Sequence, residues 1–162
     1  MSKPTKEQRD LLKRYLDQYR LAKDKQRVLR ERLAEIQAEF GSPATSRPGK
    51  APRKRSGVSA GAASPTFKLA DIEERIRGQA EVEAAAIFSV IEMIDELPPD
   101  SMEKYILELR HIDCKPWSEI FEIVHLSKSP CFEYYSRGLD RLLATGKTRV
   151  ILSDFKSRIS RE

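Results

Sequence analysis

The sequence predicts an all-α protein in which long coiled-coil helices precede a C-terminal unit of three shorter helices. Three observations support this fold class. Four of the seven glycines among the 162 residues lie within residues 41–65, so most of the chain can remain helical. Residues 5–40 and 66–97 contain no proline and carry apolar side chains at helical spacing. The C-terminal part repeats this spacing in shorter segments, which proline, glycine or polar residues separate.

Residues 1–40 are predicted to form one long amphipathic helix. Thr5 and Gln8 have the spacing of a capping box at its start. A helix of about 35 residues spans roughly 50 Å and cannot bury its own apolar stripe, so it needs a partner helix. The stripe follows a heptad repeat, which predicts a coiled coil. The predicted seam consists of Leu12, Tyr15, Tyr19, Gln26, Leu29, Leu33 and Ile36.

Residues 41–65 are predicted to form a flexible linker that is rich in glycine, proline, serine and basic residues. The interval holds five basic residues and no acidic one, and it offers too little apolar surface to offset the entropy of ordering. Its cluster of Arg53, Lys54 and Arg55 could lie along phosphates, although a solvated basic spacer is an equally good interpretation.

A second long helix is predicted over residues 66–97, before Pro98 and Pro99 end it. Two arrangements of the long helices remain open. They could pair antiparallel within one chain, or the first helix could form a homodimer in which Gln26 fixes the register. The predicted buried stripe of the second helix runs through Leu69, Ile72, Ile76, Gln79/Ala80, Glu83, Ala86/Ile87, Val90, Met93/Ile94 and Leu97.

Residues 100–146 are predicted to form a three-helix domain. Asp100 is expected to cap a first helix that places Tyr105, Ile106 and Leu109 on one face. A short helix over 117–124 and a three-residue corner would follow, with Ser127 as the cap of a longer helix that leaves at Gly146. This order matches a helix-turn-helix. The last helix should bury Cys131, Tyr135, Gly138/Leu139 and Leu142, and its outward face should carry Lys128, Ser129, Phe132, Glu133, Ser136, Arg137 and Arg141.

The segment YILELRHIDCKPWSEIFEIVHLSKSPCFEYYSRGLDRLL, residues 105–143, resembles region 4 of sigma-70-type RNA polymerase sigma factors. Within it, ILELR is similar to the family's leucine–arginine helix, and WSEIFEIVHLS is similar to its aromatic-x-E-I-A-x-x-L-G-I-S segment. The whole layout also resembles the ArpU-type late activators of Gram-positive phages, which join a basic helical half to a region-4-like C-terminus. The resemblance implies promoter-proximal DNA binding and transcriptional control of phage or prophage genes.

Two residues at the corner depart from the family's pattern. Phe121 stands where the family usually has alanine, and His125 stands where a turn glycine is usual. A residue other than glycine resists a positive φ, so we expect a wider corner in this chain.

The sequence therefore predicts a DNA-binding regulator and not an enzyme, because it contains no glycine-rich phosphate loop and no G-x-S-x-G or H-E-x-x-H motif. The outward face of the last helix would contact double-stranded DNA. The long helices would form a homodimer or dock on a partner such as RNA polymerase. Residues 147–162 are predicted to be a basic tail, either a phosphate-contacting extension that uses Lys147 and Arg149 or a frayed helix.

No metal or cofactor is expected. The order of His111, Cys114, His125 and Cys131 fits no usual zinc pattern. Two cysteines and the lack of a long apolar run predict a cytoplasmic protein without a membrane segment.

Two other functions remain open. One is a protein-interaction adaptor that has lost DNA reading, because residues 100–146 carry six basic and eight acidic residues. The other is a recognition subunit for phage DNA packaging.

Overall fold

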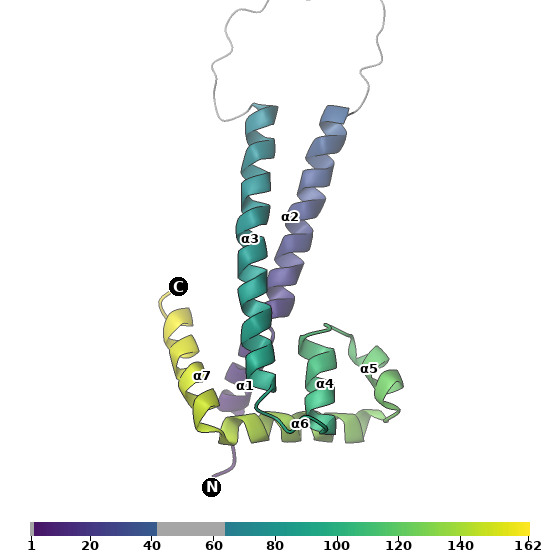
Figure 1. Cartoon of the computed structure of the whole chain (residues 1–162), viewed down its shortest axis with the longest axis vertical. Helices are drawn as coiled ribbons and strands as arrows, with labels where there is room; N and C mark the ends of the chain where they lie inside the picture. The colour runs from purple at the N-terminus through teal and green to yellow at the C-terminus, as the bar shows by residue number, and fades with distance from the viewer. Residues whose placement is uncertain (1, 42–63) are drawn as a thin grey trace, which may run out of the picture. The chain divides into compact units, whose positions relative to one another are not determined.

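The computed structural model describes residues 2–41 and 64–162, and all regular secondary structure in these ranges is α-helical. This confirms the predicted all-α class. Figure 1 shows the elements in chain order. They are α1 (Lys6–Leu16), α2 (Gln18–Gly41), α3 (Pro65–Ile94), α4 (Met102–His111), α5 (Trp117–Val124), α6 (Lys128–Ala144) and α7 (Gly146–Ile159).

The chain divides into two units, and α2 and α3 contribute to both. Unit 1 comprises Met1–Lys23 and Glu83–Glu162, and unit 2 comprises Asp24–Val82. Within unit 2, α2 and α3 run antiparallel (Figure 1), which is one of the two arrangements that the sequence left open. The buried Gln26 side chain donates from Nε2 to the carbonyl oxygen of Ile76, 3.2 Å away, so it joins the two helices of one chain.

The apolar stripes of unit 2 are only partly covered. Leu29, Leu33 and Ile36 of the predicted seam are half-buried, and so are Leu69 and Ile72 on α3. The linker predicted over 41–65, with its cluster of Arg53, Lys54 and Arg55, lies outside the described residues except at its two ends.

The single helix predicted over residues 1–40 is interrupted at Asp17, between α1 and α2. The Asp17 carboxylate lies 3.2 Å from Nη2 of Arg20, and the interruption lets α1 pack against α6 and α7. The predicted continuous seam is therefore wrong at its start, because Leu12 and Tyr15 lie in the core of unit 1. The free energy gained by burying these large apolar side chains in unit 1 exceeds the cost of interrupting the helical hydrogen bonds at Asp17.

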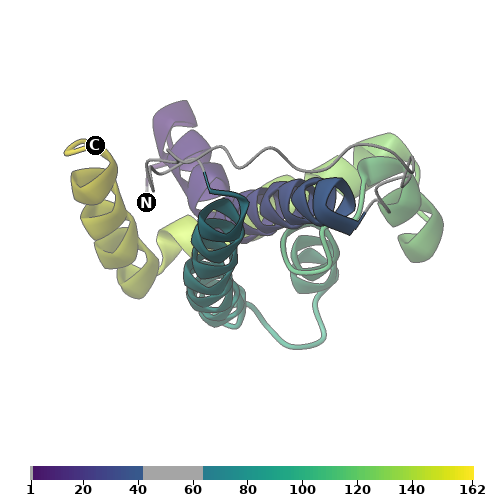
Figure 2. The same cartoon turned by 90° about the horizontal axis from the view of Figure 1, so that it is seen from above.

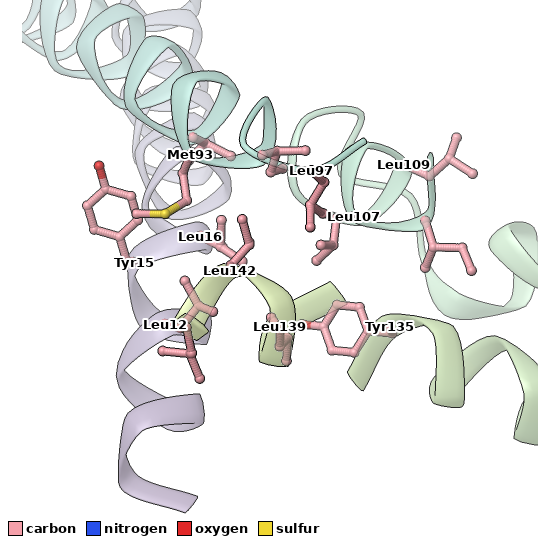
Figure 3. Close-up of a cluster of buried hydrophobic side chains, with 14 of the residues drawn as sticks. Leu12, Tyr15, Leu16, Met93, Leu97, Leu107, Leu109, Tyr135, Leu139 and Leu142 are labelled. Carbon is pink, nitrogen blue, oxygen red and sulfur yellow. The ribbon is translucent and has the colours of Figure 1, made fainter. Parts of the chain in front are cut away.

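Helix α6 is the common partner in unit 1, since it packs against α1, α4, α5 and α7. Figures 1 and 2 place α5 and α7 at opposite ends of it. Figure 3 shows Leu12 and Leu16 of α1 meeting Leu139 and Leu142 of α6, with Met93 of α3 and Leu97 of the turn after it above them. The stripe predicted for α6 is confirmed, because all of its members are buried: Cys131, Tyr135, Gly138, Leu139 and Leu142.

The start of α4 differs from the sequence prediction. Ser101, and not Asp100, is the N-cap, because its Oγ accepts a hydrogen bond of 3.2 Å from the backbone N–H of Lys104. The same hydroxyl donates to the carbonyl oxygen of Pro98 at 2.7 Å, so it ties the helix start to the preceding proline turn. Tyr105 is 43% exposed, whereas Leu107 is fully buried. The predicted face of α4 is therefore confirmed for Ile106 and Leu109, which are buried, and wrong for Tyr105.

The predicted basic tail is a packed helix. Gly146 begins α7 instead of serving as the exit from α6, and Thr145 connects the two helices. The Thr145 hydroxyl donates to the carbonyl oxygen of Leu142 at 2.9 Å and accepts from the N–H of Thr148 at 3.3 Å. Leu152 is buried, and the ring of Phe155 meets that of Tyr15 edge-on with centroids 5.3 Å apart.

Candidate functional site

The outward face of α6 forms an open groove with a volume of about 680 Å³. Arg141 lies on the same helix beyond the groove, and its side chain is 49% exposed. Asp140 lines the groove together with six of the seven residues predicted for this face. These six are Lys128, Ser129, Phe132, Glu133, Ser136 and Arg137.

The corner between α5 and α6 is tight. His125 adopts the left-handed conformation, with φ 54° and ψ 39°, and ends α5 by donating its N–H to the carbonyl oxygen of Phe121. Leu126 donates to the same oxygen at 3.2 Å. The expectation of a wider corner is therefore wrong, because the hydrogen bonds of the corner hold a non-glycine residue at positive φ, at a cost of about 1–2 kcal/mol.

Phe132 takes part in an aromatic cluster and is half-buried. Its ring centroid lies 4.7 Å from that of Trp117 and 5.7 Å from that of Phe121, in edge-to-face arrangements. The bulk of Phe121, which the family pattern would replace by alanine, thus packs against Phe132. One side of Phe132 lines the groove while the other holds α5 against α6.

The charges on this face are partly neutralised. Arg137 and Arg141 each lie 3.6 Å from the same oxygen, Oε1 of Glu103 on α4. Asp140 is held by Arg9 of α1 through two hydrogen bonds of 2.7 Å. Lys128 is exposed and makes no ion pair with any other residue that the structure describes. The outward face of α6 therefore offers one unpaired lysine and two arginines that share one carboxylate, with Arg141 beyond the groove.

The two basic residues predicted for phosphate contact at the start of α7 have different surroundings. Lys147 Nζ lies 2.8 Å from Glu96 and 3.5 Å from Glu92, and the hydrogen bond to Glu96 raises the pKa of the lysine. Arg149 is exposed, forms no ion pair within residues 2–41 and 64–162, and lines a second hollow together with Lys3 at the N-terminus. Arg149 is consequently the better placed of the two for an external anion.

A buried polar group lies beneath the site. His111 of α4 is 2% exposed, and its Nε2 lies 3.0 Å from the hydroxyl of Tyr135 on α6. Its Nδ1 lies 3.3 Å from the Asp17 carboxylate without a well-aligned hydrogen bond. A carboxylate only accepts, so Nδ1 carries the proton and Nε2 accepts from the tyrosine. Burial lowers the pKa of His111 and outweighs the nearby Asp17, so the imidazole is neutral near pH 7.

Stability should fall on mild acidification because of His111. Its pKa is about 6.5 in the unfolded chain and lower in the folded one, so protons bind preferentially to the unfolded chain below that value. The contribution is fully present above pH 6.5 and is lost as the pH falls toward the folded pKa. We expect urea denaturation to show the free energy of unfolding decreasing between pH 6.5 and pH 5, by at most about 1.4 kcal/mol per pH unit for this proton.

The chain contains a matched control for this measurement, since its other histidine, His125, is exposed. His111→Gln should flatten the dependence in this window, whereas His125→Gln should keep it. Burial raises the pKa of the Asp17 carboxyl, but the nearby His111 and Arg20 side chains lower this pKa by more, so Asp17 contributes to the pH dependence only in more acidic solution than His111 does. An unchanged slope in His111→Gln would contradict the assignment.

Sequence reasoning missed two residues next to the predicted face, Glu103 and Arg9. Glu103 precedes the buried residues Ile106 and Leu107 by three and four positions, and this spacing could have placed it on the inner face of α4. Nothing local to Arg9 indicates its partner, which is 131 residues away. Within residues 2–41 and 64–162, no three His, Cys, Asp or Glu side chains form a group that could hold a metal ion.

Among the helices that the structure describes, none is long and apolar enough to span a membrane. Comparison with family models, curated proteins and solved structures finds no match to this chain.

Proposed function

We propose that this chain is a DNA-binding transcriptional regulator of phage type whose α4–α6 segment acts as a sigma region 4-like helix-turn-helix. The observation that supports this most directly is the outward face of α6, where lysine, arginine and serine side chains line one open groove after a tight three-residue corner. A helix in this position can enter the major groove of DNA, and these residue types bond to base edges and phosphates.

In this proposal the face of α6 reads the base pairs. Lys128 and Arg137 donate to purine acceptors or phosphates, and Glu133 accepts from a cytosine amino group. Arg149 and the linker residues Arg53, Lys54 and Arg55 supply phosphate contacts that are independent of sequence. These contacts are needed because residues 100–146 carry more acidic than basic residues.

The α2–α3 pair would act as the dimerisation element, or as the part that docks on RNA polymerase. Its half-buried stripes and the exposed rings of Phe40 and Phe67, 49% and 60% exposed, leave apolar surface for a partner helix. A two-fold dimer would bind paired half-sites about one helical turn of DNA apart, or a multiple of it.

Selection of bound duplexes from a random pool near physiological salt tests the proposal. We expect one motif to be enriched and binding to weaken steeply as salt is added. Lys128→Ala combined with Arg137→Ala should abolish the preference for that motif, with a loss of about 1–3 kcal/mol for each base contact removed.

Lys156→Ala with Arg158→Ala is the matched control, because both residues are exposed on α7 and the same charge is removed. This pair should weaken binding to all duplexes alike and leave the preference unchanged. Absence of enrichment, or a preference that survives the Lys128 and Arg137 substitutions, would contradict DNA reading by α6. A chain that binds no duplex would instead favour the adaptor function.

A further inference from the structure

Glu103 is a buried acidic residue that lies between α4 and two arginines of α6. It is 5% exposed, and its Oε1 lies 3.6 Å from Nη1 of Arg137 and 3.6 Å from Nη1 of Arg141. The arginine side chains themselves remain 56% and 49% exposed, so each presents other N–H groups to the outside. A buried carboxylate is costly unless it is paired, and here both paired cations belong to the face proposed to contact DNA.

Gly138 makes this arrangement possible. A Cβ atom at this position would lie 2.9 Å from Cδ1 of Leu107 and 3.2 Å from Cβ of Glu103. Glycine therefore lets α4 lie close to α6 without displacing Leu107, and the carboxylate of Glu103 reaches Arg137 and Arg141. Two arginines four residues apart on a helix repel each other, and a carboxylate shared between them removes that repulsion.

We propose that Glu103 is a positioning residue of the DNA-contacting face, which raises sequence preference by holding Arg137 and Arg141 and by offsetting one of their two charges. This inference rests on the proposed DNA-binding function. An arginine that swings freely can pair with any phosphate, whereas reading a base requires its planar fork to be held in place. Cancelling one positive charge also lowers the attraction to DNA of any sequence. Positioning the arginines therefore increases the ratio of specific to non-specific affinity, and the shared carboxylate limits binding to DNA of any sequence.

Glu103→Gln tests the inference, because it removes the charge and keeps the shape. We expect the variant to bind random duplex more tightly, with a log–log salt slope steeper by about one unit. The ratio of affinities for the selected motif and for random duplex should fall about tenfold, as expected for the loss of one positioned base contact.

Glu108→Gln is the matched control, since it lies on the same helix and changes the net charge equally. Its carboxylate is 3.8 Å from Lys104 and is not paired with the arginines of α6. It should leave the ratio unchanged. Thermal unfolding of both variants shows whether the fold is kept.

Arg137→Lys with Arg141→Lys provides a second measurement if Glu103→Gln fails to fold. The pair keeps the net charge and removes the planar forks, so the ratio should fall about tenfold while binding to random duplex stays near that of the parent. A ratio that stays unchanged in the folded variants would overturn the positioning role alone. A parent chain that binds no duplex would overturn the proposed function, and this inference with it.

Discussion

Gly138→Val is expected to destabilise unit 1 by about 3 kcal/mol, because it places a larger side chain against the closely packed side chains of Leu107 and Glu103 on α4. The first added carbon already meets Leu107 at 2.9 Å and Glu103 at 3.2 Å, and the valine methyl groups extend further toward α4. Packing α4 against α6 at this distance leaves no room for relaxation without moving the buried Leu107. Trp117 is the only tryptophan and contacts Tyr135 of α6, so its fluorescence in urea reports the loss.

Gly78→Val is the control for the change in helix propensity. A Cβ atom at Gly78 meets nothing within 4 Å, and this glycine is exposed on α3. Valine is a slightly better helix former than glycine, so stability should change by less than about 0.5 kcal/mol. Equal effects of the two substitutions would show that α4 and α6 are not in close contact at Gly138.

Leu152→Ala is expected to cost about 3 kcal/mol, as is typical for deleting a buried leucine side chain. Leu152 is 4% exposed and belongs to the core cluster of unit 1. Urea denaturation measures the loss, and Val150→Ala on the same helix is the control, because Val150 is 63% exposed. The control should change stability by about 0.5 kcal/mol or less. A free energy of unfolding unaffected by Leu152→Ala would restore the sequence-based interpretation of residues 147–162 as a basic tail.

Regular apolar spacing predicted the helices and the buried side of α6 well. Cys131, Tyr135 and Leu139 recur every four residues, and no distant contact was needed to place them inward. The same reasoning failed at Asp17, where the heptad repeat continues but the helix does not. The heptad repeat favours one unbroken helix. It carries no sign that Leu12 is buried against a helix more than a hundred residues further along the chain.

The candidate site was predictable in its membership but not in its electrostatics. The outward positions of α6 follow from the inward ones, so six of the groove residues could be named from spacing alone. The pairing of Arg137 and Arg141 with Glu103 depends on how closely α4 approaches, and one glycine sets that distance. A frayed helix was one of the two interpretations of residues 147–162, but its burial was not predicted, because basic residues between Thr148, Leu152 and Phe155 made the segment resemble a tail.

The ion pair between Arg9 and Asp140 joins positions separated by 131 residues, and this separation has a consequence for synthesis on the ribosome. At about 5–20 residues per second, α1 leaves the ribosome on the order of ten seconds before its partners α6 and α7 exist. During that interval Leu12 and Leu16 have no core to enter. The nascent chain therefore exposes the apolar face of α1 until α6 and α7 have been synthesised, and chaperones that shield such segments would act on it in this period.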